Sequence, residues 1–178
     1  MRKILIVGGG YAGFYTAKKL QKHLARNEAQ VTIVDPLPYM TYQPSVETAI
    51  RSAGRFMAEC GCDAIKLEGG AAMADKIKGI AEAGIPAIGH LGLTPQSVSA
   101  LGGFRVQGKS AVLARKIVDD AKALEKAGAF AILLEMVPDR LCQIITERAE
   151  NCIIMSLGSG PHAHGQLLIY HDMFGLYP

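Results

Sequence analysis

The chain has 178 residues, 49% of them hydrophobic, which is enough for one well-packed core but leaves little for a second independent domain. The net charge of +3 is small and the basic residues are scattered, so we expect no nucleic-acid partner. The apolar runs are too short to span a membrane. The four cysteines lack the paired spacing of a zinc site, which favours a reduced, cytoplasmic protein.

Short apolar runs alternate along the chain with stretches of helical spacing. This alternation predicts an α/β protein with a parallel sheet, either open and doubly wound or curved into a barrel. A closed eight-unit barrel typically takes about 250 residues, so we expect a barrel formed by this chain to be incomplete. The predicted strands cover residues 4–7, 31–34, 64–67, 85–91, 130–134, 153–157 and 167–170, and the predicted helices cover residues 12–25, 46–59, 73–83, 110–127 and 140–149.

Three glycines after the first predicted strand have the spacing of a nucleotide-binding turn. Gly8, Gly10 and Gly13 follow the Gly-x-Gly-x-x-Gly pattern, and Asp35 ends the next strand 22 residues after Gly13. Such glycines bring a pyrophosphate close to the start of a helix, and the acid accepts hydrogen bonds from an adenosine ribose. These four residues are therefore candidate cofactor-binding residues. A tight strand-to-helix turn without a ligand would use the same glycines.

The same segment continues with Val34-Asp35-Pro36 and with a run from Tyr39 to Pro44. With these residues, segment 1–44 resembles the FAD-binding start of type II NADH dehydrogenases and related flavoproteins. The resemblance implies a Rossmann-type βαβ segment that contacts the ADP half of FAD. One such unit has no pocket for the flavin ring, so binding of FAD or NAD without redox activity is the alternative function that we keep.

The remainder of the chain carries a different set of motifs. They are found, in this order, at residues 45–49, 63–70, 84–97, 102–109, 134–138 and 171–176. With them, segment 45–178 resembles the ketopantoate hydroxymethyltransferase family of phosphoenolpyruvate/pyruvate-type barrels. The resemblance implies transfer of a one-carbon unit from methylenetetrahydrofolate to the 2-oxo acid 2-oxoisovalerate, a step of pantothenate biosynthesis. It also implies Mg²⁺ and a homo-oligomer.

Four polar residues of this segment are candidates for the chemistry, which begins with removal of a proton next to a carbonyl. Glu68 and Glu135 each end a predicted strand, where a parallel barrel places its functional groups. The resemblance implies that Glu68 binds metal, that Glu135 is the general base and that His90 donates a hydrogen bond to the substrate. Lys66, two residues before Glu68 and so on the same side of the strand, could neutralise the substrate carboxylate.

Asp35 has two predicted roles, because the segment after it also resembles a metal-binding motif of the hydroxymethyltransferases. It is either the ribose acid of a dinucleotide site or a second metal ligand beside Glu68. The family's earlier Asp-Ser pair has no counterpart here. We therefore expect an incomplete TIM-like barrel whose first strands are replaced by a Rossmann-type βαβ unit, with impaired activity. A chimeric or designed chain without activity remains the third interpretation.

Overall fold

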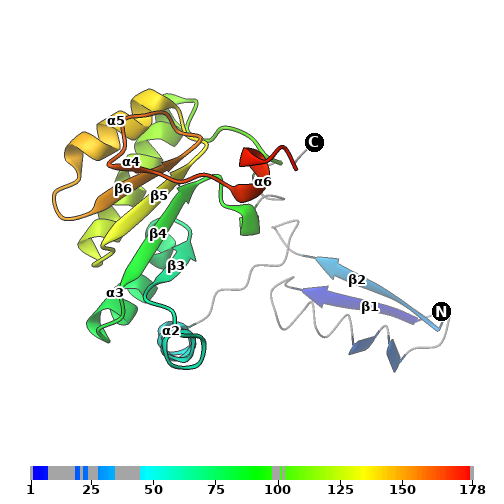
Figure 1. Ribbon diagram of the computed structural model, residues 1–178. Helices are drawn as coiled ribbons and strands as arrows, with labels where there is room; N and C mark the ends of the chain where they lie inside the picture. Colours follow the sequence, from blue (N-terminus) through cyan, green and yellow to red (C-terminus); the bar gives the residue numbers. More distant parts are fainter. Residues whose placement is uncertain are drawn as a thin grey trace. The chain divides into compact units, whose positions relative to one another are not determined.

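The computed structural model describes residues 2–7, 19–20, 22–23, 28–34, 45–97, 101 and 103–176, and the chain divides into two compact units, Met1–Gln43 and Pro44–Pro178. In the first unit, strands β1 (Arg2–Val7) and β2 (Ala29–Val34) pair in parallel (Figure 1). Both predicted strands are confirmed, and each begins two residues earlier than expected. Gly8, Gly10, Gly13 and Asp35 lie outside the described residues, so their predicted roles stay predictions.

The second unit is a parallel five-stranded sheet with helices packed on it, as the alternation of strands and helices predicts. Its strands lie in the order β3-β4-β5-β6-β7, and every pair is parallel. The strands are β3 (Ile65–Glu68), β4 (Ala87–Gly92), β5 (Ala131–Glu135), β6 (Ile153–Leu157) and β7 (Gly165–Gln166). The helices are α2 (Val46–Cys60), α3 (Ala74–Glu82), α4 (Ala111–Lys126), α5 (Asp139–Arg148) and α6 (Tyr170–Met173), with short 3₁₀ turns η1 (Ala71–Met73) and η2 (Pro95–Ser97).

The ends of the two longest helices are set by local chemistry. Ser45 and Ser110 stand just before α2 and α4, and each side chain accepts a hydrogen bond from a backbone N–H of the first turn, as preferred N-cap residues do. Gly61 ends α2 in the left-handed conformation, with φ of 66°. Within the described part of the chain, no helix is long and apolar enough to cross a membrane.

The last predicted strand, at residues 167–170, is wrong. Strand β7 occupies Gly165–Gln166 instead, and Tyr170 already begins α6. The N–H of Leu167 still donates to the carbonyl of Ser156 at 2.8 Å, but Leu168 is 68% exposed. The apolar run therefore leaves the sheet at its edge, and composition alone does not distinguish such a run from a buried strand.

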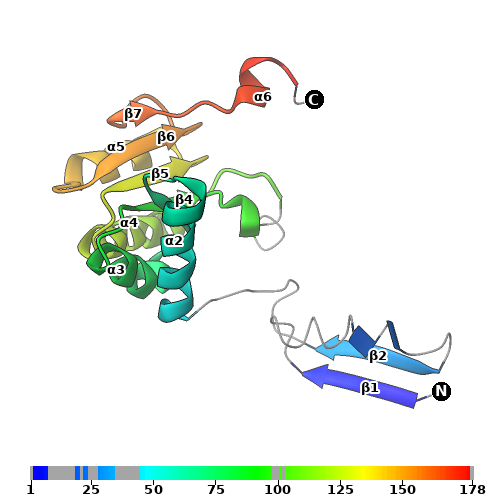
Figure 2. The ribbon, with the colours of Figure 1, turned by 60° about the horizontal axis from the view of Figure 1, so that its bottom comes forward.

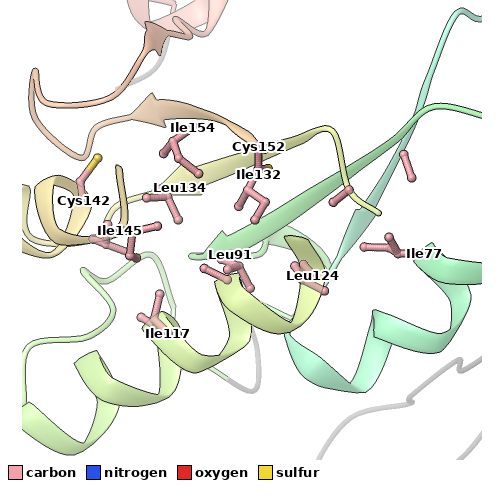
Figure 3. Packing of buried hydrophobic residues seen from close by; sticks show 14 of the residues in the cluster. Ile77, Leu91, Ile117, Leu124, Ile132, Leu134, Cys142, Ile145, Cys152 and Ile154 are labelled. Carbon is pink, nitrogen blue, oxygen red and sulfur yellow. The ribbon is translucent and has the colours of Figure 1, made fainter. Parts of the chain in front are cut away.

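The hydrophobic core lies between one face of the sheet and helices α3, α4 and α5. Alternate residues of β4, β5 and β6 point to the helices, because successive side chains of a strand point to opposite faces. These residues pack with helix residues in one buried cluster (Figure 3). The cluster includes Ile77, Leu91, Ile117, Leu124, Ile132, Leu134, Cys142, Ile145, Cys152 and Ile154.

The opposite face of the sheet carries the polar residues. Lys66 and Glu68 of β3, His90 of β4 and Glu135 of β5 alternate with the core residues of their strands. The loop after β4 and helix α6 lie near the carboxyl ends of the strands in two views (Figures 1 and 2). The polar face is thus bordered by loops at the sheet edge where parallel α/β proteins place their sites.

Gly92 permits the close approach of β4 to β5 at this edge. Its φ is 90°, and a Cβ atom there would meet the backbone carbonyl of Glu135 and the side chain of Val137. We predict that Gly92→Ala lowers the free energy of unfolding by about 3–4 kcal/mol, because it combines backbone strain with a clash against backbone. Urea unfolding measures the change.

Gly61→Ala is the matched control. Gly61 also has a positive φ, but nothing lies within 4 Å of an added Cβ atom. The free energy of unfolding of this variant should fall only by the cost of placing alanine in the left-handed conformation, about 1–2 kcal/mol. Equal losses in the two variants would contradict the close approach of the two strands at Gly92.

Candidate active site

The register of three neighbouring strands brings Glu68, His90 and Glu135 together. Glu68 of β3 lies opposite His90 of β4, and Glu135 of β5 lies opposite Gly92, two residues beyond His90. His90 Nδ1 is 3.5 Å from Glu68 Oε1, and His90 Nε2 is 3.0 Å from Glu135 Oε2. The imidazole ring thus stands between two carboxyl groups from the two adjacent strands.

His90 is the most deeply buried member of this group. Its side chain is 1% exposed, and neither ring nitrogen has the alignment of a hydrogen bond to any described residue, although both carboxylates are near. Burial lowers the pKa of His90, and the positive charge of Lys66 lowers it further, while Glu68 opposes the change. His90 therefore favours the neutral form, which has one N–H donor and one acceptor nitrogen.

Glu135 has the opposite shift with the same main cause. Its side chain is 13% exposed, and burial raises the pKa of this carboxyl group above its ordinary value. The positive charge of Lys66 acts against this change, while the negative charges of Glu68 and Asp172 add to it. A carboxylate that is poorly solvated is a stronger base than one in water, which is the property that a proton-abstracting group needs.

Glu68 is held by the loop that follows β4. Its Oε2 accepts a hydrogen bond from the backbone N–H of Gln96 at 3.0 Å. The chain directly after Glu68 is tied in turn to α4, because the N–H of Ala71 donates to Asp120 Oδ1 at 2.9 Å and Lys116 Nζ lies 2.6 Å from Asp120 Oδ2. Glu68 is therefore fixed both at its carboxylate and through the loop that follows it.

Lys66 is an exposed residue of β3, two positions before Glu68. Its charge influences the pKa of both His90 and Glu135. Glu68, His90 and Glu135 thus form one group, and Lys66 lies on the same strand as Glu68, two residues before it. Among the described residues, no cluster of three or more His, Cys, Asp or Glu side chains could hold a metal ion.

Sequence reasoning missed Gln96, Asp120 and Ser159 as parts of this region. The contribution of Gln96 comes from its backbone, so its residue type carries no signal. Asp120 did carry one: it occurs on the apolar face of α4 between Ile117 and Leu124, and it is 7% exposed. A buried acid on an apolar helix face usually has a specific partner.

Ionisable groups gather at the carboxyl ends of the parallel strands of this α/β unit, which is the edge where parallel α/β proteins place their sites. The chain belongs to the ketopantoate hydroxymethyltransferase family, whose sequence model matches residues 16–178. The match thus includes residues 16–44, which precede the motifs on which the resemblance of segment 45–178 rests. It begins after Gly8, Gly10 and Gly13.

Named relatives agree with the family assignment. The chain is 50% identical over 156 residues to the 3-methyl-2-oxobutanoate hydroxymethyltransferase of Clostridium acetobutylicum, and 50% identical over 157 residues to that of Carboxydothermus hydrogenoformans. Identity to the protein of the same name from Clostridium botulinum (strain Loch Maree) is 47% over 156 residues. Each comparison covers 88% of this chain and 56% of the relative. The chain thus spans little more than half the length of these relatives.

Burial of Glu135 predicts a pH-dependent effect of Glu135→Gln on stability. In the folded protein Glu135 keeps its proton to higher pH than in the unfolded chain, where the ordinary pKa is 4.5. Wild-type stability should therefore fall as the pH rises from about 4.5 through the raised pKa. Glu135→Gln removes the charge and should gain about 1 kcal/mol relative to wild type at pH 8 and little at pH 4. Urea unfolding at both pH values measures this difference.

Glu59→Gln is the control for this prediction. Glu59 is exposed, and its hydrogen bonds from Arg55, at 2.9 and 3.0 Å, lower its pKa. Glu59→Gln should therefore be slightly less stable than wild type at pH 8, with a smaller difference at pH 4. This effect has the opposite sign to that of Glu135→Gln. The same pH dependence in both variants would contradict the different environments of the two carboxyl groups.

Proposed function

We propose that this chain performs the proton-abstraction chemistry of a ketopantoate hydroxymethyltransferase, with 3-methyl-2-oxobutanoate (2-oxoisovalerate) as the 2-oxo acid and methylenetetrahydrofolate as the one-carbon donor. The single observation that carries the proposal is the row of Glu68, His90 and Glu135 on the polar face of the sheet, with His90 3.0 Å from Glu135. Family membership and the printed names of the relatives support the choice of substrate.

Glu135 is the general base in this proposal. It takes the proton from C3 of the 2-oxo acid, and the electron pair of the broken C–H bond moves into the enolate. Its raised pKa supports the role, because a base is most effective when its pKa lies near the working pH. Neutral His90 donates a hydrogen bond to a substrate oxygen, and Lys66 neutralises the substrate carboxylate. Water releases the one-carbon unit from methylenetetrahydrofolate as formaldehyde, so that both of its C–N bonds break and tetrahydrofolate leaves. The enolate carbon then forms the new C–C bond to this carbon, and the resulting alkoxide takes back the proton that Glu135 holds, which gives the hydroxymethyl group.

Glu68 is the metal ligand in this proposal. A single carboxylate is enough for Mg²⁺, which prefers oxygen ligands and keeps several of its waters. The carboxylate of Glu68, whose side chain is 10% exposed and which forms no ion pair with a Lys or Arg among the described residues, fits such an ion. The role of Asp35 as a second ligand stays a prediction, because this residue lies outside the described part of the chain. Mg²⁺, when bound, would stabilise the negative charge on the enolate oxygen.

The organisation of the chain is part of the proposal. We assign residues 1–44 to a Rossmann-type βαβ segment and residues 45–178 to a partial hydroxymethyltransferase barrel. We also keep the expectation of a cytoplasmic homo-oligomer. Exposed apolar side chains near the carboxyl terminus support association, since they are 59–68% exposed and lie close together in sequence. They are Leu168, Tyr170, Met173, Phe174 and Leu176.

The second candidate function is binding of FAD or NAD by the first unit. The parallel pairing of β1 with β2 favours it, because a dinucleotide-binding βαβ unit has such a pair. In this case Gly8, Gly10 and Gly13 approach the pyrophosphate and Asp35 binds the ribose. Thermal stabilisation by FAD or NAD, together with none by Mg²⁺ and 2-oxoisovalerate, would favour this second function over the first.

Proton exchange at C3 of 2-oxoisovalerate tests the first proposal. In D₂O with Mg²⁺, the protein should replace the C3 proton by deuterium, which proton NMR follows directly. Glu135→Gln should slow this exchange about 100- to 10,000-fold, because it removes the general base. Chelation of Mg²⁺ should also abolish it.

Glu59→Gln should exchange at the wild-type rate, because its carboxylate is exposed on α2. Exchange no faster than with buffer and Mg²⁺ alone would refute the proposal. Equal rates for wild type and Glu135→Gln would refute the role of Glu135.

A further inference from the structure

The hydroxyl group of Ser159 holds the backbone on both sides of Glu135. Ser159 Oγ donates to the carbonyl of Leu134 at 2.9 Å, and it accepts from the N–H of Val137 at 3.1 Å. The carbonyl of Leu157 is a second, longer acceptor at 3.3 Å. One side chain thus joins the residue before Glu135 to the second residue after it. Ser159 itself is 1% exposed.

Ser159 is oriented by a hydrogen bond within its own turn. Its backbone N–H donates to Ser156 Oγ at 3.2 Å, and Ser156 Oγ donates to the carbonyl of Gly160 at 2.9 Å. Ser156 is also fully buried. The Gly158–Gly160 turn could bind an anion on the basis of its sequence alone. The hydroxyl of Ser159 is instead engaged by the backbone of β5 and of the loop after it.

The backbone that Ser159 holds is strained. Met136, directly after Glu135, has φ of 47°, a left-handed conformation that is unfavourable for a residue with a side chain. Hydrogen bonds from three other segments maintain it. Met136 N–H donates to Leu157 O at 2.9 Å, and Gln107 N–H donates to Met136 O at 2.8 Å. Leu93 N–H donates to Glu135 O at 2.8 Å.

We infer that Ser159 is a positioning residue that holds the Glu135 carboxyl group toward His90, an inference that rests on the proposed role of Glu135 as the base. Without the hydroxyl, the strained turn at Met136 loses its contacts at Leu134 and Val137. The Glu135 side chain then samples several orientations instead of one. Proton transfer depends steeply on such placement, since a displacement of 1 Å can cost about 100-fold in rate.

Two measurements on Ser159→Ala test this inference. Three-bond NMR couplings across χ1 of Glu135 should indicate one rotamer in wild type and an average of rotamers in Ser159→Ala. For C3 proton exchange of 2-oxoisovalerate, kcat should fall about 10- to 100-fold with KM unchanged, because the substrate-binding residues are untouched. If Ser159→Ala does not fold, Ser159→Cys fills the same space with a weaker hydrogen-bonding group and should show averaged couplings to a smaller degree.

Thr146→Val is the matched control. Thr146 Oγ1 donates to the carbonyl of Cys142 at 2.9 Å within α5, so this variant likewise removes a hydroxyl group that donates to a backbone carbonyl, but at a place away from Glu135. It should retain the wild-type couplings of Glu135 and the wild-type kcat.

Unchanged Glu135 couplings in a folded Ser159→Ala variant would overturn the inference, as would equal effects in Thr146→Val. If the wild-type protein exchanges no proton, the proposed function fails, but the coupling measurement still decides whether Ser159 orients Glu135.

Discussion

The burial of His90 between two carboxyl groups is the constraint on which the rest of the site depends. The imidazole is 1% exposed and therefore shielded from solvent, and its ring nitrogens lie 3.5 Å from Glu68 Oε1 and 3.0 Å from Glu135 Oε2. Parallel pairing of β3, β4 and β5 sets both distances, because the register places Glu68 opposite His90 and Glu135 two residues beyond it. A shift of one residue in either strand pair would turn one carboxyl group toward the helices.

Each carboxyl group at the strand ends is secured from outside its own strand. The backbone N–H of Gln96 donates a hydrogen bond to the Glu68 carboxylate. The hydroxyl of Ser159 forms hydrogen bonds with the backbone on both sides of Glu135. These contacts cross between neighbouring βα units, so each unit stabilises the functional residue of another. The hydrophobic face of the sheet packs on the helices in one buried cluster, and this packing fixes the strands. The fixed strands in turn hold three ionisable side chains in one arrangement on the polar face.

Much of this fold could be predicted from sequence, because period-two and period-3.6 patterns report directly on buried faces. The predictions for α2, α3, α4 and α5 differ from the structure by one residue at the ends. Strand-end positions and the family resemblance predicted Glu68 and Glu135 as candidate site residues, and the structure places both carboxyl groups beside His90. The prediction of a strand at residues 167–170 was wrong because an exposed apolar run has the same composition as a buried one.

The supporting residues of the site could not be predicted in the same way. Ser159 occurs in a Gly-Ser-Gly turn, where serine is common without any tertiary role. Its contacts with β5 come from residues 22 and 25 positions away. Asp120 similarly bonds Ala71, 49 positions away. Such pairings are set by the packing of whole βα units, and no local pattern reports them.

The charge state of His90 in solution tests this account most directly. Long-range ¹H–¹⁵N NMR spectra distinguish neutral from protonated imidazole through the two ring nitrogens. Burial and the nearby charge of Lys66 lower the pKa of His90 below its ordinary value of 6.5. The account predicts that His90 is mainly neutral at pH 6.5 and becomes protonated only at lower pH. A ring that is mainly protonated at pH 6.5 would contradict it, because His90 would then be an ordinary cation paired with two carboxylates.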